Sequence, residues 1–286
     1  MKVAVLTDST SYIPQDLIEK YHIPIAHLYV TLNDNESYKE FVEISKEQCY
    51  DKLKDIKTAP RTSQPAIGTL VDMYEKLKDE GYTDVISIHL SSGISGTVQT
   101  AMQVNDMIEG INIHVFDTKI AAFAEGVFVL KAIELIEQGL ELDAILKELE
   151  SMREETGAYI VVDDLKYLQK SGRISNAQAW IGTLLKMKPL LCFEDGKIVP
   201  NEKVRTKKRA LKMMVRKAAE EIKDAEDKTL LVIGGDKVDE SNEVYESMKK
   251  EFPDYDVLFS EFGPVVASHL GPGGIGVGYI GRKIKM

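Results

Sequence analysis

Cysteine is scarce in this sequence, and the patterns that mark metal or redox chemistry are absent. The 286 residues include only Cys49 and Cys192, too few for a disulfide framework. Neither thiol lies near another at the spacing of a metal site. We therefore interpret both as ordinary reduced cysteines.

Metal-binding and nucleotide-binding motifs are also missing. No two of the five histidines have the H-E-x-x-H spacing of a zinc site. The glycine-rich stretch GPGGIG, residues 271–276, lacks the Lys-Ser or Lys-Thr pair of a phosphate-binding loop, and we interpret it as a tight turn. We expect no metal and no cofactor. His89 and His114 lie within apolar runs and are interpreted as packed side chains, whereas His269 stands just before the glycine-rich stretch.

Positive charge is outnumbered, since 36 lysines and arginines stand against 46 acidic residues, a net charge of -10. This balance argues against binding to a nucleic-acid backbone. No stretch approaches the ~20 consecutive apolar residues of a membrane span. The first residues, MKVAVLTDST, enter an apparent strand without the pattern of a signal peptide. We expect a cytoplasmic protein with no nucleic-acid partner and no stable membrane insertion.

The first half of the chain alternates strand and helix patterns. Apolar runs at residues 2–9, 84–92 and 111–118 are separated by helical periodicity at 68–81 and 96–110. This order favours a parallel sheet covered by helices. Each apolar run ends in small polar residues, and ligands of open α/β sheets bind outside these carboxyl ends.

The second half has a different pattern. Residues 189–204 predict a hairpin that turns at Asp195 and Gly196, and a helix is expected over residues 176–187. The chain length and 44% hydrophobic content suit two domains. We expect an N-terminal α/β domain over 1–157 and a C-terminal α+β domain with a partly antiparallel sheet over 158–286, with a ligand between them.

Two strand-to-helix turns carry hydroxyl groups at a helix entrance. In HLSSGISGT, residues 89–97, Ser92 and Ser95 precede a helix whose first amides favour an anion. In RTSQPAIGTL, Thr62 and Ser63 precede a second helix. A serine at such a position is commonly only an N-cap. Two such entrances from neighbouring units could instead converge on one carboxylate or phosphate.

A serine-dependent hydrolase or acyl transferase is the rival interpretation of the first turn. Ser95 would be the nucleophile, His269 the base and an acidic residue such as Asp8 its orienting group. The nucleophile elbow G-x-S-x-G requires glycine on both flanks of the serine. The sequence has Gly93 but Thr97 at the second position, which argues against the hydrolase.

Basic residues occupy two turns of the second half. Arg173 lies in YLQKSGRIS, and Arg205 lies where the hairpin enters a helix rich in lysine and arginine. Against the negative net charge, such a local patch is a candidate site for a phosphate or an acidic partner. We expect both arginines to lie apart from the hydroxyl-bearing turns.

A set of short motifs, in order along the chain, resembles the DegV family, the fatty-acid-binding subunits of bacterial fatty-acid kinase. The motifs extend over almost the whole chain: VLTDST, TSQPAIG, ISIHLSSGISGTVQTA, VFDTKIAAFAEG, YLQKSGRIS, KPLL, VRTKKRA and HLGPGGIG.

The resemblance implies a non-catalytic protein that holds one long-chain fatty acid between two domains. A separate ATP-dependent kinase would phosphorylate the carboxyl group, and the acyl phosphate would feed phospholipid synthesis. By the same resemblance, Thr62 and Ser95 hold the carboxylate and His269 lies beside it, while Arg173 and Arg205 serve the kinase step. Two positions depart from the family pattern: Ala66 replaces a common serine, and Ser171 a common glycine, where a positive φ would favour glycine.

Overall fold

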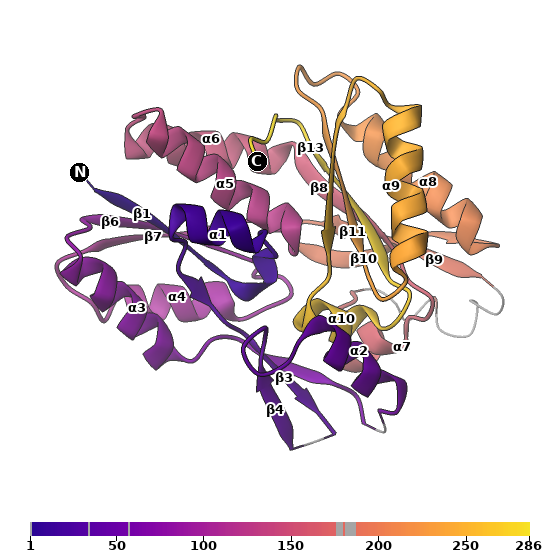
Figure 1. Ribbon diagram of the computed structural model, residues 1–286, viewed down its shortest axis with the longest axis horizontal. Coiled ribbons are helices and arrows are strands. Elements are labelled where there is room, and N and C mark those ends of the chain that lie inside the picture. Colours follow the sequence, from indigo (N-terminus) through magenta and orange to yellow (C-terminus); the bar gives the residue numbers. More distant parts are fainter. Residues whose placement is uncertain (1, 34, 57, 176–179, 181–186) are drawn as a thin grey trace.

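The computed structural model describes residues 2–33, 35–56, 58–175, 180 and 187–286 (Figure 1). The predicted helix over 176–187 therefore falls on residues of which only Trp180 and Met187 are described. Three sheets and their helices make up the described chain.

The first sheet has four parallel strands in the order β2-β1-β6-β7. Their bounds are β1 Val3–Asp8, β2 Ile25–Ala26, β6 Asp84–His89 and β7 Asn112–Asp117. Helices α3 (Ile67–Asp79) and α4 (Thr97–Asn105) pack on one face. Helices α1 (Gln15–Tyr21), α5 (Phe123–Glu137) and α6 (Leu142–Glu154) belong to the core on the other face. The predicted parallel α/β arrangement of the first half is confirmed.

The second sheet has six strands in the order β10-β9-β8-β13-β11-β12. Their bounds are β8 Thr156–Val161, β9 Lys188–Glu194, β10 Lys197–Val204, β11 Thr229–Gly234, β12 Asp256–Glu261 and β13 Ile275–Ile280. Only β11 and β12 pair in parallel. The predicted hairpin is β9–β10, and positive φ angles at Asp195 and Gly196 form its turn. The partly antiparallel sheet is thus confirmed.

Helix α5 lies between the two sheets. Phe123 and Val127 of this helix share one buried core with Val5 of the first sheet and Ile160 of the second. Helices α8 (Lys207–Glu221) and α9 (Val238–Glu251) cover the outer face of the second sheet, as Figure 1 shows. The predicted domain boundary at Gly157 falls on the second residue of β8 and stays a prediction.

A small third sheet was not predicted. It consists of antiparallel strands in the order β4-β3-β5, with bounds β3 Tyr29–Leu32, β4 Glu36–Lys39 and β5 Arg61–Ser63. Helix α2 (Lys46–Lys54) follows β4, and both the sheet and α2 pack against α10 (Pro264–Leu270) near the end of the chain. Helix α7 (Lys166–Ser171) also contacts α10. The third sheet and α2, which belong to the first half of the chain, therefore contact α10 of the second half. The candidate site lies at this junction.

Candidate functional site

Ser91, Ser92 and Ser95, in the turn after β6, make different contacts. Ser91 Oγ donates to the carbonyl of Gly196 in the β9–β10 hairpin at 2.7 Å and accepts from the amide of Gly93 at 3.1 Å. A Cβ at Gly93 would lie 2.5 Å from the Gly196 carbonyl oxygen, so only glycine permits this approach. Ser91 therefore ties the first sheet to the second at this turn.

Ser95 borders a cavity between the sheets. Its Oγ accepts from the amide of Thr97 at 3.3 Å and lies 2.9 Å from Thr97 Oγ1. Helix α4 begins at Thr97 with Gly96 as its N-cap residue, two residues after Ser95. The positive end of the α4 dipole thus lies beside the cavity.

Thr62 and His269 meet at the same cavity although 207 positions separate them. Thr62 Oγ1 lies 2.8 Å from His269 Nε2, and the tautomer of the imidazole decides which atom donates. Thr62 comes from β5 and His269 from the last turn of α10. The third sheet therefore completes the site by packing against α10.

The N-terminus of α10 is held by a buried carboxylate. Glu40 accepts from the amide of Val265 at 2.8 Å and from Ser9 Oγ at 2.5 Å. Tyr12 donates to Glu40 at 3.2 Å and accepts from the amide of Val266 at 3.2 Å. These contacts fix α10 and hence His269. The sequence carries no local signal for this role, because Glu40 follows a polar strand and resembles a surface residue.

His269 is neutral at neutral pH. Burial, with the Arg173 guanidinium nearby, lowers the pKa of His269 to about 3. Its Nδ1 is buried and has no hydrogen-bond partner among the described residues. A neutral imidazole can donate one hydrogen bond and accept another, but it offers no charge to an anion.

Arg173 supplies positive charge to the cavity, which it lines together with Thr62, Ser95 and His269. The expectation that it lies apart from the hydroxyl-bearing turns is therefore wrong. Helix α7 ends at Ser171, and Gly172 with φ of 71° turns the chain back towards α10. The Arg173 side chain donates to the carbonyl of Ser171 at 2.5 Å. Burial lowers the pKa of Arg173 from its ordinary value, although arginine keeps its charge in proteins.

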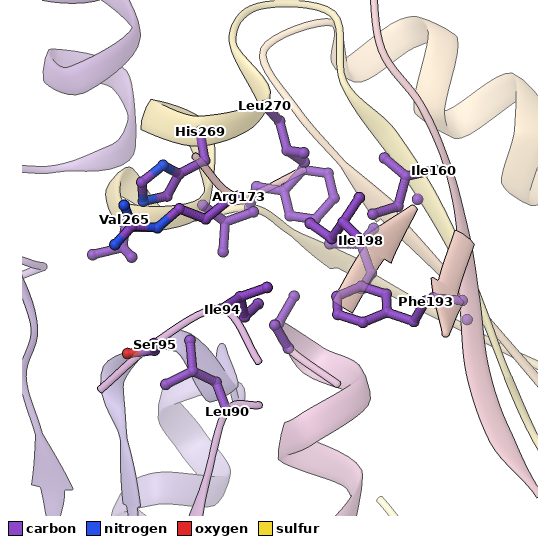
Figure 2. A pocket seen from close by; sticks show the side chains of 18 of the residues that line it. Leu90, Ile94, Ser95, Ile160, Arg173, Phe193, Ile198, Val265, His269 and Leu270 are labelled. Atoms are coloured by element: carbon purple, nitrogen blue, oxygen red, sulfur yellow. The ribbon is translucent and has the colours of Figure 1, made fainter. Parts of the chain in front are cut away.

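The rest of the cavity is apolar and leads between the sheets. Figure 2 shows Ser95, Arg173 and His269 towards one side, and Ile160, Phe193 and Ile198 towards the other. With its open mouth the cavity holds about 730 Å³ of empty space. We call Thr62, Ser95, Arg173 and His269 the polar end. The arrangement suits an elongated apolar molecule with an anionic head group.

Glycines of β13 help to keep the apolar part open. Gly276 and Gly278 line the cavity, and strand alternation directs them to the side of α5, since Ile275 and Val277 pack in the opposite core. A Cβ at Gly278 would stand 3.6 Å from Leu231 and 3.7 Å from Ala124. A larger side chain at Gly278 would therefore occupy the cavity.

Comparison with known proteins identifies the chain's relatives. Residues 2–282 match the family model described as "Uncharacterised protein, DegV family". The chain belongs to the DegV family. A DegV domain-containing protein of Staphylococcus aureus is 56% identical over 287 residues, which cover 100% of both chains.

Solved structures of the DegV family share the fold. DegV of Bacillus subtilis, described as a fatty acid binding protein, is 40% identical with a TM-score of 0.90 and 100% coverage of both chains. A fatty acid binding DegV family protein of Streptococcus agalactiae is 33% identical with a TM-score of 0.92, covering 99% of this chain and 100% of that one. The predicted family membership is confirmed.

Other candidate residues of this DegV chain lie outside the lining of the cavity. Ser92 donates to Asp117 through Oγ at 2.5 Å and through its amide at 3.2 Å. Ser63 is exposed on β5, and Arg205 is exposed between β10 and α8. Thr62 and Ser95, the first residues that the DegV resemblance assigned to the carboxylate, do meet at the cavity.

The two departures from the DegV pattern are accommodated. Ala66 is the exposed N-cap residue of α3, outside the cavity lining. Ser171 is not among the residues with positive φ, because Gly172 adopts that conformation instead. Ser171 therefore leaves the Arg173 turn unstrained.

The hydrolase triad is not assembled in the described structure. Asp8 is fully buried and binds His89 Nδ1 at 3.1 Å, whereas His269 contacts Thr62. His89 is a fully buried side chain, as predicted, whereas His114 is partly exposed and contacts Asp84 at 3.1 Å.

The described residues contain no group of three His, Cys, Asp or Glu side chains arranged to hold a metal ion. None of their helices has the length and apolar content needed to cross a membrane.

Proposed function

We propose that this chain binds a long-chain fatty acid, with the alkyl chain between the sheets and the carboxylate at the polar end. The observation that carries the proposal is an apolar cavity ending at two hydroxyl groups, a neutral imidazole and one arginine. Relatives described as fatty acid binding proteins support it. Burial of each CH₂ group contributes about 0.8 kcal/mol, so bound fatty acid should survive purification.

We further propose that the protein is not itself an enzyme and presents the carboxyl group to a separate ATP-dependent kinase, for acyl-phosphate formation in phospholipid synthesis. Arg173 would hold the head group through a charge-assisted hydrogen bond. Arg205 is exposed outside the cavity and would contact the kinase or its phosphates. The Ser92 and Ser63 hydroxyls lie outside the cavity lining, and we do not assign them to the head group.

Native mass spectrometry of purified protein tests the binding step. Wild type should carry about one fatty acid per chain, and Gly278→Val should lose it because the new side chain enters the cavity. Ile275→Val serves as the control, because Ile275 lies on the same strand but packs in the opposite core. Wild-type protein that neither carries nor takes up fatty acid would rule out the proposal.

A turnover assay with a purified bacterial fatty-acid kinase and ATP tests the presentation step. Arg205→Ala should retain fatty acid and lose acyl-phosphate formation, whereas Arg173→Ala should impair both. Acyl-phosphate formation at the wild-type rate by Arg205→Ala would remove that residue from the kinase contact. Hydrolysis of acyl esters by wild type alone, abolished in Ser95→Ala, would establish the hydrolase instead.

A further inference from the structure

A second pocket adjoins the polar end. It lies between the segment that leads into β5 and the end of α7, and it shares Thr62 and Arg173 with the cavity. Its other lining residues are Thr58, Ala59, Pro60, Arg61, Lys170 and Ser171. The head group of a molecule in the cavity would therefore lie next to this pocket.

The lining of the second pocket is cationic. Arg61, Lys170 and Arg173 line it, and no aspartate or glutamate is among its described lining residues. Lys170 is exposed and has no carboxylate partner in the described part of the chain, whereas Lys166 of the same helix pairs with Asp164 at 3.1 Å. In a chain with a net charge of -10, such a cationic lining favours the binding of an anion.

Thr58 adds a hydroxyl group to the lining of the second pocket. Its Oγ1 is buried and has no hydrogen-bond partner among the described residues. A buried hydroxyl is usually hydrogen-bonded. A ligand oxygen in the pocket could accept its hydrogen bond.

The chemistry of the proposed function requires such a pocket. In acyl-phosphate formation a carboxylate oxygen attacks the γ-phosphorus of ATP, the bond from that phosphorus to the bridging oxygen breaks, and ADP leaves. The carboxylate carries one negative charge, whereas a phosphoryl group carries about two near neutral pH. At the polar end only Arg173 is charged, because His269 is neutral. The product therefore needs cations that the substrate does not.

We propose that the second pocket binds the phosphoryl group of the acyl phosphate, with Arg61 and Lys170 as cations beside Arg173 and Thr58 as a hydrogen-bond donor. This inference rests on the proposed function. It assigns Arg61 and Lys170 to the product and leaves the fatty acid to the polar end.

Binding of two ligands of equal chain length tests the assignment without any kinase. One ligand is a long-chain fatty acid, and the other is a 2-oxoalkyl phosphonate, the analogue of the acyl phosphate in which a methylene group replaces the bridging oxygen. Arg61→Ala and Lys170→Ala should each weaken phosphonate binding about fivefold, and the double variant about twentyfold. Fatty-acid binding should stay at the wild-type level. The phosphonate should also be the more sensitive of the two to added salt.

Two controls keep the result interpretable. Lys166→Ala removes the same charge from α7 outside the pocket and should change neither affinity, and Lys170→Arg should restore phosphonate binding. Equal losses for both ligands, or no loss for the phosphonate, would overturn the assignment while fatty-acid binding stands. Failure of wild type to bind either ligand would overturn the proposed function as well.

Discussion

Two clusters of polar side chains lie near the carboxyl edge of the first sheet. They differ in whether other groups of the protein satisfy their hydrogen bonds. The carboxylate cluster consists of Asp8, Glu40 and Glu125, each with 0% exposure. The polar end of the cavity consists of Thr62, Ser95, Arg173 and His269.

The carboxylate cluster is satisfied by the protein itself. Asp8 accepts from His89 Nδ1, from the amide of Leu90 and from the hydroxyl of Thr10. Glu125 accepts from Thr7 and Thr10 at 3.1 and 3.0 Å. Burial, with the charge of Asp8 nearby, raises the pKa of Glu125 well above its ordinary value. Such a network stabilises one arrangement of the chain.

The polar end instead faces a cavity with a buried His269 nitrogen that has no partner among the described residues. Each cluster includes a polar residue at or just after the end of a strand, Asp8 of β1 and Ser95 after β6, so residue type alone does not separate them. The open cavity, rather than polarity, therefore distinguishes the candidate site.

Removal of Asp8 should have the largest effect on stability. Asp8→Ala leaves the buried His89 and the amides of Leu90 and Thr10 without their acceptor, and should lower the free energy of unfolding by about 3 to 5 kcal/mol. Urea unfolding measures the change. Asp16→Ala, on the exposed face of α1, should change stability by less than about 0.5 kcal/mol. A loss in Asp8→Ala as small as that would contradict the stabilising role of the cluster.

Local sequence patterns predict some elements of the fold and miss others. Strands β1 and β6 are buried apolar runs and β7 is a partly buried one, each with a local sequence signal, and their predicted polar endings are present. The third sheet was missed because β3, β4 and β5 have only three or four residues each. It nevertheless positions Thr62 against α10.

The candidate site was predicted only in part. Thr62 and Ser95 follow local turn patterns and the family resemblance, but the contact of Thr62 with His269 depends on packing between distant segments. Arg173 was placed wrongly because the reversal at Gly172 brings it back to the cavity. Local periodicity carries no information on either feature.

The charge of Glu40 should make stability depend on pH. Burial raises the pKa of Glu40 from 4.5 to about 7. The folded state therefore favours the protonated carboxyl more than the unfolded state does. The stabilisation is fully present below about pH 4.5 and is lost as the pH rises through about 7. A shift of this size corresponds to about 3 kcal/mol.

Glu40→Gln tests this dependence, because glutamine keeps an acceptor for the amide of Val265 but does not ionise. The wild type should lose stability relative to the variant between about pH 4.5 and about pH 8. Urea unfolding of both proteins at each pH gives the difference between their free energies of unfolding. Glu125 and His269 titrate in both proteins, so their contributions cancel in this difference. A difference that is constant with pH would show that Glu40 has no raised pKa in the folded protein.

The smallest effect, and the one that bears most directly on the polar end, should follow removal of a single hydroxyl. Ser95→Ala and Thr62→Ala should each weaken fatty-acid binding about tenfold, because a partly buried carboxylate loses one charge-assisted hydrogen bond worth about 1.5 to 3 kcal/mol. Calorimetric titration of delipidated protein with fatty acid measures the affinity. Ser95→Ala should also cost up to about 1 kcal/mol of stability, since Ser95 Oγ accepts from the amide of Thr97.

Ser92→Ala is the matched control in the same turn. Its hydroxyl donates to Asp117 and lies outside the cavity lining, so the substitution should leave affinity unchanged although it removes the same group. Thr62→Ser should likewise keep the contact with His269 and retain binding. If Ser92→Ala weakens binding as much as Ser95→Ala does, the fatty acid interacts with the whole turn and the polar end must be extended to Ser92. If neither Ser95→Ala nor Thr62→Ala weakens it, the carboxylate lies elsewhere, and Arg173 with His269 would have to hold it alone.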